Sequence, residues 1–195
     1  IYIKNLSVGD FGPSFKYKDF TVNELIISGL PVSATLGLSS IIISLFLGSF
    51  LGIIAAVKRN TYFDYSVMSV SLVGICVPSF VMAPILSLFF GLYLGILPTS
   101  GWNGGNILNL ILPITALSLP QIAVISRMMR ASTIEVLNSN FIRTARSKGL
   151  KSSYIIRKHV IRASILPIIE YLAPASAGLM TGSIIVEQIF GLPGI

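Results

Sequence analysis

Charged residues are scarce in this sequence, and two long stretches lack them altogether. Asp, Glu, Lys and Arg make up 11% of the 195 positions and hydrophobic residues 53%, whereas roughly a quarter of the residues in a soluble domain are charged. No charge occurs in the 33 positions between Glu24 and Lys58, or in the 62 positions between Asp64 and Arg127. A membrane crossing needs about 20 apolar residues for roughly 30 Å of hydrocarbon. The composition therefore predicts a membrane protein.

The residues that carry most catalytic and metal chemistry are also nearly missing. Cys76 is the single cysteine, so neither a disulfide framework nor a cysteine metal site is expected. The single histidine, His159, lies among basic residues, which leaves the serines of the apolar runs without the base that an intramembrane protease needs. The phosphate-binding pattern Gly-x-x-x-x-Gly-Lys is absent. We therefore expect no catalytic residue, no metal site and no cofactor bound by this chain.

Positive charge is concentrated in one stretch. The whole chain has a formal net charge of +7, and residues 127–162 contain nine Lys and Arg residues opposed only by Glu135. Basic proteins often bind nucleic acid, but a basic loop between apolar segments of membrane length is typical of the cytoplasmic side of a membrane protein. The positive-inside rule places residues 127–162 in the cytoplasm, and no nucleic-acid partner is expected.

The apolar runs predict an all-α polytopic membrane protein with about four crossings. We expect residues 1–28 to form an external or interfacial segment and residues 29–195 to form the transmembrane domain, with a cytoplasmic loop at 131–162. The crossings are expected at about 29–57, 65–97, 107–125 and 163–188. This topology puts both ends outside. The sequence does not begin with a signal peptide. The abrupt end at Gly194-Ile195 is expected of a fragment, and a cytoplasmic start would require at least one earlier helix, so we expect a fragment that lacks terminal helices.

Turn and capping residues refine these boundaries. Pro31 is expected in the first turn of the first helix, where its missing N–H has no partner to lose. Asp64 is expected to cap the second helix, because a carboxylate suits a helix N-terminus. Pro78 and Pro84 fall inside the second crossing and predict a kink. Such a helix can line a cavity or a path through the membrane or act as a gate, or it is simply bent by packing, and these interpretations remain open.

Small residues recur every four positions along the first crossing. The stripe consists of Ser40, Ser44, Gly48, Gly52 and Ala56. Small side chains let a neighbouring helix approach closely, and packing contacts drive helix association in lipid. We expect Ser44, Gly48 and Gly52 to pack against another helix of this chain.

Two acids interrupt the last apolar segment, where ionisable groups are functional candidates because burying them is costly. Glu187 is near the expected outer end and is expected to reach water. Glu170 follows the basic stretch, so it is expected near the cytoplasmic interface, paired with Arg162 or another basic side chain. A proton-coupled carrier that uses Glu170 is the alternative function that these acids support.

The segment FIRTARSKGL, Phe141–Leu150, predicts a short basic helix that ends at a glycine. Gly149 suits the left-handed conformation that terminates a helix, and Leu150 can then fold back on Ala145. A second helix is expected to begin near residues 152–153 and to run toward Pro167. A helix, a glycine and a second helix between two crossings form a feature suited to contact with a partner.

At these residues the sequence resembles the membrane subunits of binding-protein-dependent ABC importers. Their cytoplasmic loop carries Glu-Ala-Ala, three residues, Gly, nine residues and Ile-x-Leu-Pro. The corresponding positions here are Arg143-Thr144-Ala145, Gly149 and His159-Val160-Ile161-Arg162. Ala145, Gly149 and Ile161 match, whereas arginine replaces the leading acid and the closing proline. Together with DFGPSFKYKDF, GWNGG and VEQIFGLPG, this pattern is similar to the B-type membrane subunit of oligopeptide and dipeptide permeases.

This resemblance implies the fold of a type I ABC importer permease in a bacterial inner membrane. It implies a second homologous permease subunit, two cytoplasmic ATP-binding subunits that use ATP, and an external peptide-binding protein. The loop helix would dock into a cleft of the ATPase through Phe141, Arg143, Thr144, Ala145, Arg146, Lys148, Gly149 and Leu150. Arg143 would require an acidic residue of the ATPase as its partner. The residues alone leave open other solutes, such as nickel or oligosaccharides.

Overall fold

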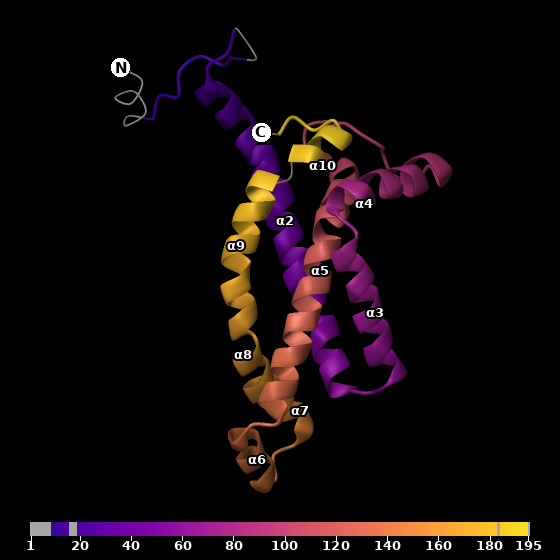
Figure 1. The fold of residues 1–195 in the computed structure, drawn as a ribbon, viewed down its shortest axis with the longest axis vertical. Coiled ribbons are helices and arrows are strands. Elements are labelled where there is room, and N and C mark those ends of the chain that lie inside the picture. The colour runs from indigo at the N-terminus through magenta and orange to yellow at the C-terminus, as the bar shows by residue number, and fades with distance from the viewer. Residues whose placement is uncertain (1–8, 16–18, 183, 195) are drawn as a thin grey trace.

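The computed structural model describes residues 9–15, 19–182 and 184–194. The chain is helical over these residues, without a named strand, and one isolated β-bridge joins Pro13 and Thr21. The elements in order are α2 (Val22–Val57), α3 (Tyr62–Cys76), α4 (Ser79–Leu86), η1 (Ser87–Tyr93), α5 (Ile107–Leu137), α6 (Asn140–Ser147), α7 (Ser152–Ile155), η2 (Ile156–Val160), α8 (Ile161–Ser164), α9 (Leu166–Gly182) and α10 (Ile184–Ile189). Figure 1 shows an elongated bundle with the start of α2 and α10 at one end and α6 and α7 at the other. The predicted all-α fold is confirmed.

Helices α2 and α5 form the centre of the bundle and pack along much of their lengths (Figure 1). The small residues of α2 make this contact. A Cβ atom added to Gly48 would lie 2.9 Å from Cβ of Ile125, and one added to Gly52 would lie 2.5 Å from the carbonyl oxygen of Ser126. The hydroxyl group of Ser44 also donates a hydrogen bond of 3.1 Å to a carbonyl group of α5. The stripe therefore allows the two backbones to approach more closely than larger side chains would permit.

Helix α2 begins at Val22, well before the expected start near residue 29. Thr21 and Glu24 form a capping box: the Glu24 N–H donates to the Thr21 hydroxyl at 3.3 Å, and the Thr21 N–H donates to the Glu24 carboxylate at 2.8 Å. Pro31 consequently lies inside the helix, and its expected place in the first turn is wrong. The expected external or interfacial segment 1–28 includes Glu24, whereas this carboxylate caps the helix.

The second predicted crossing is broken rather than kinked. Helix α3 ends at Cys76 and α4 begins at Ser79, and the segments on the two sides of this break are bent by 102°. Val77 has an extended backbone, with φ −91° and ψ 113°, because the ring of a following proline disfavours the α conformation. Pro78 then occupies the N-cap position of α4. The chain therefore turns sharply across α5 at this point (Figure 1).

The last predicted crossing is also divided. A bend of 43° separates residues 152–164 from α9, which ends at Gly182 before the short α10. By length and composition, α2 and α5 can each cross a membrane, and the two bent pairs raise the number of candidate spans to as many as four. Glu187 of α10 is 2% exposed, so the expectation that it reaches water is wrong.

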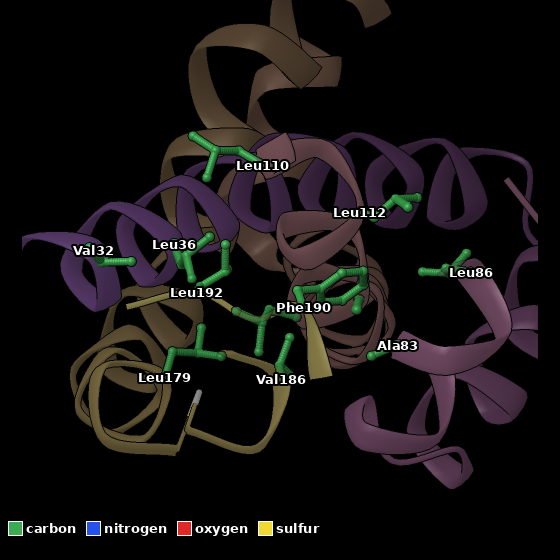
Figure 2. Packing of buried hydrophobic residues seen from close by; sticks show 12 residues of the cluster. Val32, Leu36, Ala83, Leu86, Leu110, Leu112, Leu179, Val186, Phe190 and Leu192 are labelled. Carbon is green, nitrogen blue, oxygen red and sulfur yellow. The ribbon is translucent and has the colours of Figure 1, made fainter. Parts of the chain in front are cut away.

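The main apolar core lies in the half of the bundle that contains α4 and α10. Helices α2, α4, α5, α9 and α10 contribute side chains to it, together with Leu192. Figure 2 shows Phe190, which is 1% exposed, among these side chains. Large apolar side chains on the outside remain exposed, including Phe46 and Leu92, each at 70%. Such an apolar surface suits contact with lipid.

Candidate functional site

The basic stretch forms one end of the bundle, here called the tip and defined as residues 138–164 (Figure 1). Helix α5 extends to Leu137, beyond the end expected near residue 125. Residues 131–137 of the expected loop are therefore helical, and α6 begins at Asn140 after two intervening residues. The tip is a set of short helices carried directly on the end of α5.

Helix α6 ends at a glycine, as the sequence predicts. Gly149 has a φ of +77°, a conformation in which the absence of a Cβ atom removes the steric cost. Its N–H donates to the carbonyl group of Arg146 at 2.9 Å, and the Leu150 N–H donates to that of Ala145 at 3.4 Å. These two bonds form a Schellman motif, which satisfies carbonyl groups at the end of the helix. The chain then reverses and enters α7.

A small apolar cluster holds α6 in place. Ile142 and Ala145 of α6, which are 0% and 8% exposed, pack with Ile155 and Val160 of the following helical segment. Side chains at the end of α5 border this cluster. The cluster therefore lies between α6 and the end of α5. Ala145, expected on the docking surface, faces this cluster instead.

The remaining side of α6 is exposed and basic. Phe141 and Leu150 are 49% and 38% exposed. The other exposed positions of the expected docking set are Arg143, Thr144, Arg146, Lys148 and Gly149. Apolar groups flank a row of cations here, an arrangement that suits a cleft with acidic walls. In the part of the chain that the structure describes, no group of three His, Cys, Asp or Glu residues could hold a metal ion.

An ion pair fastens α3 to α5 next to the tip. The carboxylate of Asp64 accepts two hydrogen bonds from the Arg130 guanidinium, of 2.5 Å from Nε and 2.7 Å from Nη2. A third bond, of 3.0 Å, comes from the N–H of Asn60. Asp64 is fully buried, whereas the Arg130 side chain is 25% exposed. This bidentate geometry is the strong form of an ion pair.

Sequence reasoning missed this pair. Asp64 was expected to cap α3, but Thr61 occupies the N-cap position and Asp64 lies in the first turn. The two partners are 66 positions apart, a separation at which neither charge predicts the other. The available signal was that Asp64 is a lone acid between two long apolar runs, because such an acid usually needs a cationic partner.

The other candidate residues lie away from the tip. Pro78, at the N-cap of α4, and Pro84, inside α4, are both exposed. An apolar groove of about 350 Å³ includes Val77, the residue before Pro78, but neither proline lines it. Ser69, Val70, Val73, Gly74, Val77, Met82 and Leu119 line this groove. Glu170 is exposed on α9, and among the described residues it forms neither an ion pair nor a hydrogen bond through its side chain. Its expected pairing with Arg162 or another basic side chain is therefore wrong.

Comparison with known proteins identifies relatives over the whole chain. The family of binding-protein-dependent transport system inner membrane components matches residues 48–195. The oligopeptide transport system permease protein OppB of Haemophilus influenzae is 53% identical over 195 residues, which cover 100% of this chain and 64% of that protein. OppB of Escherichia coli K12 is 52% identical, with 100% of this chain and 63% of that protein covered. The dipeptide transport system permease protein DppB of Bacillus subtilis is 39% identical, with 100% and 62% covered.

These relatives are longer than this chain. The chain spans slightly less than two thirds of their length. The matched region of the family includes α3 through α10 and the end of α2, and it therefore contains the tip, the Asp64–Arg130 pair and Glu170.

Proposed function

Because the chain belongs to the family of binding-protein-dependent transport system inner membrane components, we propose that it is a permease subunit that forms half of the path for oligopeptides in an ATP-driven importer. Its all-helical fold is that of the type I ABC permease family. The names of the relatives, which are oligopeptide and dipeptide permeases, support a peptide substrate. In this proposal the chain catalyses no reaction and binds no cofactor, and partner subunits use the ATP.

Helix α6 is the observation that carries this proposal. It presents exposed cations and the exposed apolar groups Phe141 and Leu150. Its buried side, which includes Ile142, belongs to an apolar cluster against which the end of α5 packs. A helix that is both accessible to a partner and joined to a long helix can transfer the motion of a cytoplasmic ATPase to the rest of the bundle.

The remaining components follow from the same proposal. A second homologous permease subunit completes the path, two ATP-binding subunits contact the tips, and an external peptide-binding protein delivers the substrate. The positive charge of residues 127–162 supports a position of the tip on the cytoplasmic face of a bacterial inner membrane. The start of α2 and α10, at the opposite end of the bundle (Figure 1), then face the outside.

Arg143 gives this docking proposal a chemical requirement. It is exposed on α6 and has no acidic neighbour within salt-bridge distance in the part of the chain that the structure describes. A guanidinium group binds a carboxylate through two parallel hydrogen bonds. The ATPase should therefore present an Asp or Glu residue to Arg143.

Replacing Gly149 by valine tests the proposed coupling. A β-branched residue is strained at a φ of +77°, so the end of α6 should change while the long helices remain intact. In a reconstituted complex, we expect peptide uptake per ATP hydrolysed to fall by at least about tenfold, as when one misplaced contact disrupts a coupled step. Normal coupling in this variant would contradict the proposal.

Gly104→Val is the matched control. Gly104 has a similar φ of +67° and, like Gly149, has no atom within 4 Å of an added Cβ, but it lies in the connection before α5, far from α6 in the sequence. The Gly104→Val variant should leave the ratio of peptide uptake to ATP hydrolysis unchanged. Uptake that follows a pH gradient without ATP would instead support the proton-coupled carrier that uses Glu170.

A further inference from the structure

Helix α9 has one open face, and on it lies a carboxylate that pairs with no other residue in the described part of the chain. Exposed residues recur along this face three or four positions apart, and include Ile169, Glu170, Ala173, Pro174, Ala177 and Gly178. The other side of α9 packs on α2 and α5. Ile168 is 0% exposed there, and the Tyr171 hydroxyl donates a hydrogen bond of 2.6 Å to Gln121. Figure 1 shows α9 at an edge of the bundle, so Glu170 faces away from the core of this chain.

Glu170 lies well inside the candidate span. It follows Arg162, the last cation of the chain, by eight positions, or about 12 Å of helix. Helix α9 continues beyond it to Gly182. Because the hydrocarbon core is about 30 Å thick, these lengths indicate that Glu170 lies within the hydrocarbon rather than at the cytoplasmic interface expected from the sequence, although the 43° bend before α9 shortens its depth. A carboxylate at that depth is strongly disfavoured against lipid, so it should face water or a cationic group.

The same turn of α9 also lacks a hydrogen-bond donor. Pro174 lies inside the helix and has no N–H, although an N–H at this position would normally bond to the carbonyl group of Glu170. This carbonyl group therefore loses its usual helical donor. The short side chain of Ala173 leaves space beside it. Glu170 consequently offers two acceptors, its carboxylate and its own carbonyl group, in a segment without a positive charge.

We propose that Glu170 binds the protonated amino group of a peptide as the peptide passes along the translocation path. The inference rests on the proposed peptide import, and it names a residue that selects the substrate. An ammonium group carries a positive charge and three N–H donors, which match a carboxylate and a carbonyl oxygen. A peptide with a free N-terminus always carries this group. Glu170 then neutralises its charge at a depth where water is scarce.

Cysteine protection in the full-length permease, assembled with its partner subunits in lipid nanodiscs, tests this proposal. Cys76→Ser removes the cysteine of this sequence, cysteines elsewhere in the full-length chain and its partner subunits are likewise replaced by serine, and Ala173→Cys places a reporter one helical turn from Glu170. A charged, water-soluble thiosulfonate should modify this reporter. Trialanine should slow the modification at least about tenfold more than N-acetyl-trialanine at the same concentration, because one charge-assisted hydrogen bond is worth about this factor.

Two further variants decide the role of the carboxylate. With Glu170→Gln added, both peptides should protect the reporter equally. With Glu135→Gln added, which removes an exposed carboxylate near the tip, the difference between the two peptides should remain. A difference that persists in Glu170→Gln, or equal protection in the chain that retains Glu170, overturns the proposal. A reporter that the reagent cannot modify also overturns it, because lipid or the second subunit would then cover the face.

The uptake assay separates this inference from the function on which it rests. If the complete transporter shows no ATP-driven peptide uptake, the proposed function fails whatever the reporter shows. If ATP-driven uptake is present but the reporter does not distinguish the two peptides, peptide import stands and the amino-group site alone is rejected.

Discussion

Asp64→Asn removes one charge from the ion pair that fastens α3 to α5, while the side chain keeps its shape. The asparagine oxygen can still accept the 3.0 Å bond from Asn60, but the two bonds from Arg130 lose their ionic character. Removing one partner of a buried pair costs about 3–5 kcal/mol. Arg130 is 25% exposed and can partly rehydrate, so we expect a smaller loss of roughly 2 kcal/mol in the free energy of unfolding.

Reversible denaturant unfolding in mixed micelles measures this loss. Ser71→Ala is the matched control, because it removes the hydrogen bond of 2.8 Å between Ser71 and Ser126 at the same α3–α5 contact. Hydrogen bonds between helices in membranes are worth about 0.6 kcal/mol on average, so this variant should be the milder of the two. Arg130→Gln combined with Asp64→Asn should lower the free energy of unfolding little more than Asp64→Asn alone, because both variants break the same ion pair. Equal effects of Asp64→Asn and Ser71→Ala, or full additivity with Arg130→Gln, would refute the assignment of the pair.

Two further predictions concern packing. Gly52→Ala should destabilise the chain by about 1–3 kcal/mol, because the added Cβ would lie 2.5 Å from the Ser126 carbonyl oxygen. Gly178→Ala, where nothing lies within 4 Å, should not destabilise it, and equal unfolding midpoints would contradict this reasoning. Ile142→Ala should lower the free energy of local unfolding of α6 by about 2–3 kcal/mol. Amide hydrogen exchange in α6 should therefore become faster, while exchange in α2 stays the same. Unchanged exchange in α6 would mean that the apolar cluster does not hold this helix.

The sequence predicts helices well where one local signal decides the conformation. Gly149 is an example, since a glycine after a basic helix favours the left-handed conformation whatever packs around it. The stripe that contains Gly48 and Gly52 is another, because small residues at a four-residue spacing lie on one helix face. Both features depend only on neighbours in the chain, and both have the predicted local form.

Boundaries and partners were harder to predict. Uncharged runs indicate how much chain can enter a membrane, but not where a helix turns, and the break at Val77 and Pro78 was therefore predicted as a kink. A proline in a sequence is compatible with a first turn, a kink or a break. Which of these occurs depends on whether neighbouring helices support the bent chain, and α4 packs against α5 here.

The sequence by itself determined that this is a helical membrane protein, that its positive charge gathers in one segment, and that a glycine ends the helix there. These properties follow from composition, hydropathy and local backbone preferences. Tertiary structure alone decided that Asp64 meets Arg130, that Ala145 faces inward and that Glu170 faces outward without Arg162. Each of these outcomes depends on how helices distant in the sequence pack, because packing determines which side of a helix is covered and which charges come within bonding distance.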